Sequence, residues 1–162
     1  MIGHDSDGAT FRFPALTAST LSGRTLRLPQ DLAGALNVLL LAFAREQQAD
    51  VDTWLPALAA LRAAEPRLAY YGMPTLPRAL RAMSPLIAGG MRAGIPDRAA
   101  RDVTVVLYVD LERFRTALGL PDTGQVHVVA VDRDGRVRWS GGGACTDAQR
   151  DALAAAVRTA LA

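Results

Sequence analysis

The chain has 162 residues, of which 50% are hydrophobic and 21% charged, a composition that excludes general disorder and suits one ordinary domain. Its one cysteine, Cys145, excludes an intrachain disulfide, a CxxC redox pair and a four-cysteine zinc site. All 18 basic residues are arginine, a bias that together with 30 alanines is typical of a GC-rich genome. Because the arginines are interleaved with 16 acidic residues, the net charge of +2 does not indicate nucleic-acid binding.

The N-terminal residues 1–10 are polar and lack the basic start and apolar run of a signal peptide. We predict a flexible tail over residues 1–10, followed by a single domain over residues 11–162. The longest apolar run, residues 38–44, is too short to span a bilayer. We therefore expect no integral membrane segment and a cytoplasmic location, with which the unpaired Cys145 agrees.

In chain order, the hydrophobic pattern predicts strands at residues 23–28, 37–43, 68–71, 103–109, 126–131 and 136–140, and helices at residues 51–64, 111–118 and 147–161. Residues 74–101 mix helical stretches with glycines and prolines. Asp50 is the expected N-cap of the first helix, and Thr146 with Gln149 forms a capping-box pattern for the last. Helices between strands predict parallel neighbours, and Asp134-Gly135 predicts a hairpin between the last two strands.

This order resembles the thioredoxin-like fold, and two sequence stretches carry the resemblance. LSGRTLRLPQDLAGALNVLLLAF (residues 21–43) is similar to the start of the redoxin branch, and VDRDGRVRWSGGG (residues 131–143) is similar to its late hairpin. The resemblance implies an α/β fold, a three-layer sandwich whose mixed central sheet is flanked by helices and extended by an N-terminal β-hairpin.

Alignment on Phe43 and Pro56 identifies the positions that carry the two active cysteines in thioredoxin-like reductases. Gln48 and Val51 stand there, and neither is a thiol. The place of the family's cis-proline is held by Val126, followed by His127. The resemblance therefore implies that the fold is kept while the dithiol chemistry is lost.

Two further stretches, FRTALGL (residues 114–120) and HVVAVDRDGRVRWSGGGACT (residues 127–146), are similar to the mitochondrial ATP synthase assembly factor with a thioredoxin-like domain. That family likewise has glutamine or serine where the redox cysteines would be. The resemblance implies a non-redox protein that helps a membrane complex to assemble by binding a subunit. For this chain it implies a protein client as a class of partner.

The fold implied by the resemblance brings REQQADVDTW (residues 45–54) and GGGAC (residues 141–145) together at the former active-site edge, with His127 close by. Asp50 and Asp52 would occupy the positive end of the helix, which argues against a phosphate or thiolate site there. The glycines leave the backbone open to an extended peptide. The candidate binding residues are Arg45, Glu46, Gln47, Gln48, Asp50, Asp52, Met91, Arg92, Trp139 and Gly142.

Most of these residues also have a purely structural interpretation. Asp50 and Asp52 suit a helix cap and dipole partner, Trp54 falls in the apolar series of its helix, and Trp139 is as often exposed as buried at such a position. The leading hypothesis is a non-catalytic thioredoxin-like protein-binding domain, an assembly or chaperone-like factor. It requires no cofactor, no metal and no nucleic acid, and it leaves a homodimer open.

The alternative hypothesis is a single-cysteine thiol oxidoreductase or antioxidant that uses Cys145. This residue precedes the Thr146 cap, where the positive end of the last helix is expected to lower the thiol pKa. His127 could then act as its base if it lies within hydrogen-bond reach. Against this, a free cysteine more often packs as a small apolar side chain.

Overall fold

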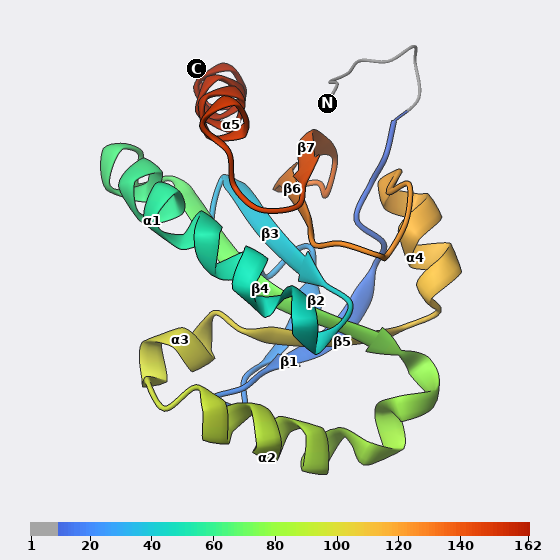
Figure 1. The fold of residues 1–162 in the computed structure, drawn as a ribbon. Coiled ribbons are helices and arrows are strands. Elements are labelled where there is room, and N and C mark those ends of the chain that lie inside the picture. The colour runs from blue at the N-terminus through green and yellow to red at the C-terminus, as the bar shows by residue number, and fades with distance from the viewer. Residues whose placement is uncertain (1–9) are drawn as a thin grey trace.

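A mixed sheet forms the centre of the protein, with the strand order β2-β1-β5-β4-β3-β6-β7 (Figure 1). The computed structural model describes residues 10–162, so the predicted tail lies almost wholly outside the described residues. The strands are β1 (Leu16–Thr20), β2 (Thr25–Leu28), β3 (Leu36–Ala42), β4 (Leu68–Pro77), β5 (Val105–Val109), β6 (His127–Asp132) and β7 (Val137–Gly142). The helices are α1 (Gln48–Ala64), α2 (Ser84–Gly94), α3 (Arg98–Asp102), α4 (Leu111–Leu118) and α5 (Asp147–Ala160), with short 3-10 turns η1 (Arg45–Gln47) and η2 (Arg78–Met83).

The three central strands β3, β4 and β5 run parallel, whereas β1, β6 and β7 are antiparallel to their neighbours. The carboxyl ends of the parallel strands therefore lie at one end of the sheet. Because β6 is antiparallel to β3, with Leu41 paired to His127, the start of β6 lies at this same end. The fully buried strand β3 is thus positioned to present the residues that follow it beside the loop before β6.

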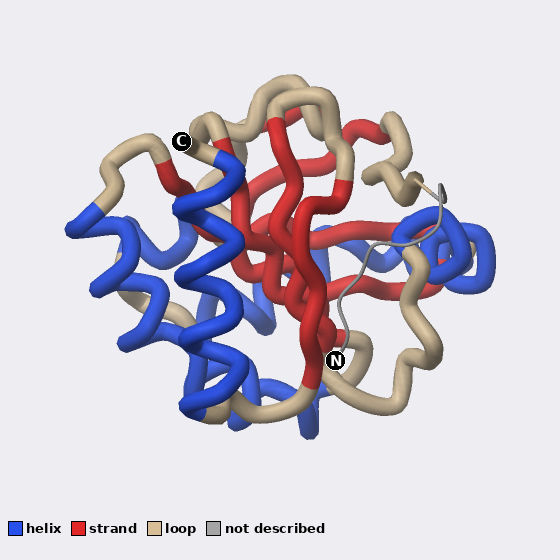
Figure 2. The backbone as a smooth tube through the Cα atoms, turned by 90° about the horizontal axis from the view of Figure 1, so that it is seen from above, coloured by secondary structure: helices blue, strands red, loops and turns tan. Residues whose placement is uncertain are grey.

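Two hydrophobic layers, one on each face of the sheet, form the core. Alternate residues of β3 supply both: Leu39 and Leu41 face one layer, and Val38 and Leu40 face the other. Helix α4 covers the first layer through its buried side chains, and α1 and α5 cover the second. Figure 2 shows helices on both sides of the strands. The predicted three-layer α/β sandwich of the thioredoxin type, with its N-terminal hairpin β1–β2, is confirmed.

The largest differences between the structure and the sequence prediction concern β1, β4, β5 and the start of α1. The hydrophobic pattern predicted no strand at β1, although the resemblance implied an N-terminal hairpin. Strand β4 has ten residues instead of four, β5 begins at Val105, and α1 begins at Gln48. Asp50 is therefore not an N-cap: η1 leads directly into α1 and places Asp50 within the first helical turn. Of residues 74–101, where the sequence pattern was mixed, 74–77 belong to the end of β4, and those that follow lie in η2, α2 and α3 with their connections.

Within residues 10–162, no helix combines the length and the apolar character that crossing a membrane requires.

Candidate functional site

The two segments expected at the former active-site edge are in contact. The indole Nε1 of Trp54 donates a hydrogen bond to the carbonyl oxygen of Gly143 at 2.9 Å, and the backbone N–H of Cys145 donates to Thr53 Oγ1 at 2.9 Å. We call this surface, formed by residues 43–54, 121–127 and 141–146, the rim. The predicted approach of the segment after β3 to the segment after β7 is thus confirmed.

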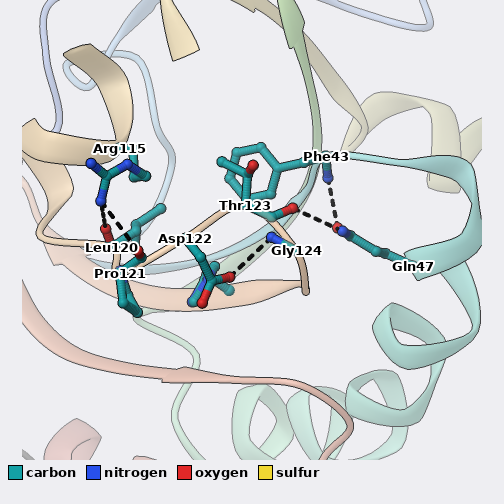
Figure 3. A network of polar contacts seen from close by, with 9 residues as sticks. Phe43, Gln47, Arg115, Leu120, Pro121, Asp122, Thr123 and Gly124 are labelled. Atoms are coloured by element: carbon teal, nitrogen blue, oxygen red, sulfur yellow. Dashed lines mark hydrogen bonds and ion pairs between the residues drawn. The ribbon is translucent and has the colours of Figure 1, made fainter. Parts of the chain in front are cut away.

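Gln47 holds the rim together from the inside (Figure 3). Its side chain is buried, with 9% of the residue exposed. The backbone N–H of Phe43 donates to Gln47 Oε1 at 2.8 Å, and Gln47 Nε2 donates to the carbonyl oxygen of Thr123 at 3.1 Å. Both ends of the amide are therefore already used within the chain, and Gln47 ties the end of β3 to the loop before β6.

The loop of residues 121–125 is fixed by a second set of polar contacts. Asp122 Oδ1 accepts a hydrogen bond from the backbone N–H of Gly124 at 2.9 Å and lies 3.3 Å from His127 Nε2. From α4, Arg115 Nη1 donates to the carbonyl oxygens of Leu120 at 2.7 Å and Pro121 at 3.3 Å. No candidate residue was predicted in this loop, although its Pro-Asp-Thr-Gly sequence is a turn signal.

His127 is buried at the base of the rim, with 4% of the residue exposed. Its ring packs edge-on against Phe43, with 6.3 Å between the ring centroids, and its Nε2 is engaged by Asp122. The hydrogen bond to His127 is the main reason why the pKa of Asp122 lies below its ordinary value. His127 thus serves to anchor the loop.

The positions that correspond to the two active cysteines face different environments. Gln48 is exposed, and its Nε2 donates to Asp52 Oδ1 one helical turn later, at 3.0 Å. Val51 is buried against the second core layer. Arg45 and Glu46 are exposed in η1. From η1 and the start of α1, the rim exposes the charged and amide side chains of Arg45, Glu46, Gln48 and Asp52.

The glycine segment after β7 is less open than its composition suggests. The backbone N–H of Gly142 donates to Gln149 Oε1 at 3.0 Å, and Gln149 Nε2 donates to the carbonyl oxygens of Gly142 at 3.0 Å and Ala144 at 3.2 Å. The side-chain amide thus takes the place of a peptide group on the outer edge of β7. The backbone N–H and carbonyl of Gly142, where an extended peptide was expected to dock, are therefore already hydrogen-bonded to Gln149. Because Gln149 is used there, only the Thr146 half of the predicted capping box forms, with Thr146 Oγ1 accepting from the backbone N–H of Gln149 at 3.1 Å.

Cys145 is half-buried, and its thiol donates to the carbonyl oxygen of Thr146 at 3.7 Å. Burial raises the pKa of the Cys145 thiol, and the nearby Arg150 guanidinium opposes this shift only in part. The expectation of a lowered pKa was wrong because loss of hydration raises the pKa more than the Arg150 guanidinium lowers it. No hydrogen bond joins Cys145 to His127 in the part of the chain that the structure describes, since His127 is paired with Asp122.

The remaining candidates lie in two places. Trp139 is half-buried and packs edge-on against the fully buried Trp54, with 6.1 Å between ring centroids, so it supports the rim from β7. Met91 and Arg92 lie on α2, and Arg92 Nη1 is 3.5 Å from the carbonyl oxygen of Leu21, in the turn that adjoins the start of β5. That is the opposite end of the sheet from the rim, so the structure separates these two residues from the other candidates.

Solved structures of similar fold are numerous. The chain is similar to BsSco, described as a member of the Sco family of cytochrome c oxidase assembly proteins (TM-score 0.65, 14% identity, 96% of each chain covered). It is also similar to a thioredoxin family thiol:disulfide interchange protein from Chlorobium tepidum TLS (TM-score 0.58, 17% identity, 97% of this chain and 100% of that chain). A third is a thiol:disulfide interchange protein from Bacteroides sp. (TM-score 0.59, 19% identity, 94% of this chain and 89% of that chain).

At these identities the similarity shows the thioredoxin-like fold alone. No curated protein sequence matches the chain. Residues 6–160, nearly the whole sequence, match the ATP10 protein family. Together with the thioredoxin-like sheet and the missing redox cysteines, this match agrees with the assembly-factor resemblance that the hairpin motif indicated. The chain belongs to the ATP10 protein family.

Proposed function

We propose that this protein is a non-catalytic binding member of its family, which holds a protein client at the exposed part of the rim in an assembly or chaperone-like role. The observation that carries the proposal is the pair of residues at the former cysteine positions, an exposed Gln48 and a buried Val51. A dithiol exchange reaction needs two thiols at this place. Hydrogen bonding to a partner needs only the exposed amide and its charged neighbours.

The rim suits such a partner because its buried part is held by hydrogen bonds and its exposed part is polar. Gln47 and Trp54 fix the backbone through buried hydrogen bonds, which lowers the ordering cost when a partner binds. The exposed side chains of Arg45, Glu46 and Gln48 supply a cation, an anion and an amide within one turn. The likeness to BsSco supports the proposal, because that protein belongs to a family of assembly proteins and has a similar fold.

Site-specific photo-cross-linking in cells tests this proposal. A photoreactive side chain at Gln48 should give a discrete adduct with one client, whereas the same group at the exposed Arg158 on α5 should not. The adduct should weaken when Arg45 and Glu46 exchange their charges through Arg45→Glu and Glu46→Arg. Equal adducts from both positions, or none from Gln48, would refute binding at the rim.

The single-cysteine alternative is separated from this proposal by one variant. Cys145→Ser removes the thiol and should leave the Gln48 adduct unchanged, because the hydrogen bond from Cys145 to Thr53 of α1 is made by its backbone N–H. Peroxide or disulfide turnover that disappears with Cys145→Ser would favour the thiol oxidoreductase instead.

A further inference from the structure

The segment between β4 and β5 differs from the rest of the protein in its burial. It comprises η2, α2 and α3, residues 78–102, and we call it the α2 arm. None of the side chains of these three elements is fully buried. Figure 1 shows α2 along the outer side of the sheet beyond β1 and β5, away from α1 and α5. The arm is therefore a peripheral layer with one broad face toward solvent.

That face exposes large apolar side chains. Leu86 is 71% exposed and Met83 is 48% exposed, and they are the most exposed of the large hydrophobic residues that the structure describes. Ile87 and Met91, on the other side of α2, are half-buried. A helix that exposes its leucine to water while its other large apolar side chains are half-buried presents a contact surface.

The charge of the arm is strongly one-sided. It contains five arginines and two aspartates, so it carries a net charge of +3, while the rest of the chain carries −1. The ten residues between Arg81 and Arg92 contain no charged side chain at all. None of the five arginines makes an ion pair with another residue of the described part of the chain, and Arg78, Arg81 and Arg98 are exposed.

We propose that the α2 arm docks on an anionic lipid surface, with Leu86 and Met83 entering the interface and the exposed Arg78, Arg81 and Arg98 binding lipid phosphates. An uncharged stretch bracketed by arginines matches the layered chemistry of a bilayer surface, since arginine stems can lie along the apolar layer while the guanidinium groups stay at the phosphates. The attraction of the cluster to anionic headgroups supplies the charge complementarity. This mode is peripheral, and it agrees with the lack of a membrane-spanning helix in residues 10–162.

A bilayer fits the exposed face better than an acidic protein does. Between Leu86 and the end of α2, this face is formed largely by Gly89, Gly90 and Ala93, which offer no side chain for a shaped contact. Protein interfaces are centred on aromatic and arginine side chains in fitted pockets. A lipid surface needs only inserted apolar side chains and positive charge, and both are present.

Vesicle co-sedimentation of the full chain tests the proposal. The protein should bind vesicles of equal parts phosphatidylcholine and phosphatidylglycerol, bind phosphatidylcholine vesicles far less, and lose affinity as salt rises. Leu86→Asp should lower the affinity about tenfold or more, since it places a charge where an apolar side chain enters the interface. The matched control is Leu55→Asp, an exposed leucine on α1 that should bind as the unchanged protein does.

Arginine variants test the charge. Arg78→Gln together with Arg81→Gln should lower the affinity about 25-fold, at roughly a fivefold effect for each arginine near an anionic surface. The control pair is Arg62→Gln with Arg158→Gln, which are exposed on α1 and α5. Unfolding midpoints of all variants should match that of the unchanged protein, because every substituted side chain is exposed.

Several results would overturn the proposal. No binding of the unchanged protein to the mixed vesicles would leave an acidic protein as the better occupant. Equal losses for Leu86→Asp and Leu55→Asp would show that the arm is not the contact. A dimer in solution that Leu86→Asp converts to a monomer, without vesicle binding, would assign the face to a second copy. The rim variant Gln48→Ala should bind vesicles as the unchanged protein does. A negative vesicle result would therefore refute the lipid contact of the α2 arm without refuting the proposed client site at the rim.

Discussion

The two adjacent glutamines of the rim allow a sharp test of how the site is built. Gln47→Met keeps the length and approximate volume of the side chain but removes both hydrogen bonds of the buried amide. The N–H of Phe43 and the carbonyl oxygen of Thr123 then lose their partners at 2.8 and 3.1 Å. Gln48→Met makes the same chemical change one residue later, where the amide is exposed and bonded only to Asp52.

The magnitude follows from burial. A buried polar group that loses its partner costs about 1–3 kcal/mol. Since Phe43 and Thr123 are half-buried, water can partly replace the lost bonds, and we take the lower end for each. Gln47→Met should therefore destabilise the protein by about 2 kcal/mol, which lowers the melting temperature by about 4–8 °C for a chain of this size. Gln48→Met should cost about 0.5 kcal/mol or less, as expected for an exposed pair one helical turn apart.

Urea unfolding followed by far-UV circular dichroism measures both values, and an unchanged m-value confirms that only stability has moved. Proton exchange at the Phe43 amide adds a local measure, because this N–H should exchange faster in Gln47→Met alone. Equal effects of the two substitutions would refute the assignment of Gln47 as the structural residue and Gln48 as the exposed one.

Three further predictions concern other polar groups. The hydroxyl of Tyr108 is buried without a hydrogen-bond partner in residues 10–162, whereas that of Tyr71 accepts a hydrogen bond from a backbone N–H at 2.9 Å. In urea unfolding, Tyr108→Phe should therefore leave the free energy of unfolding unchanged, and Tyr71→Phe should lower it by about 1 kcal/mol. Because burial raises the pKa of Cys145, its alkylation by iodoacetamide at neutral pH should be slower than that of glutathione, and faster alkylation would contradict the structure. The bond to His127 lowers the pKa of Asp122, so its carboxylate stabilises the folded state above the ordinary carboxyl pKa of about 4, and this contribution is lost as the pH falls through the lowered value. Asp122→Asn should therefore have a lower free energy of unfolding than the unchanged protein at neutral pH and an equal one in acid. A difference in free energy of unfolding that is the same at every pH would argue against a contribution from the Asp122 carboxylate.

Several features of the fold were determined by local sequence. The apolar run that begins at residue 38 predicted a strand buried on both faces, and it lies in β3 near the centre of the sheet. Asp134-Gly135 marked the β6–β7 hairpin, and Gly119 marked the end of α4, where it adopts a positive φ of 72°. These signals are short-range, because a turn or a cap depends on residues a few positions apart. The absence of cysteine at positions 48 and 51 was likewise predicted from the sequence, by its alignment with the pattern of thioredoxin-like reductases.

Other features depended on which segments meet in space. Strand β1 is weakly patterned, and it forms because β2 and β5 pair with its two edges. The extra length of β4 likewise comes from its pairing with β3 and β5 on both sides.

The site shows the same division. The sequence predicted Gln47 and Gln48 alike as binding residues. At the start of α1, however, the Gln47 amide points inward to Thr123, 76 residues away, whereas the Gln48 amide is exposed. Gln149 fits a capping box by spacing, but the nearby backbone of Gly142 uses its side chain instead. Sequence spacing identifies which groups can form hydrogen bonds, whereas the partner each one takes is decided by long-range packing, because a buried polar group must bond to whatever the fold places beside it.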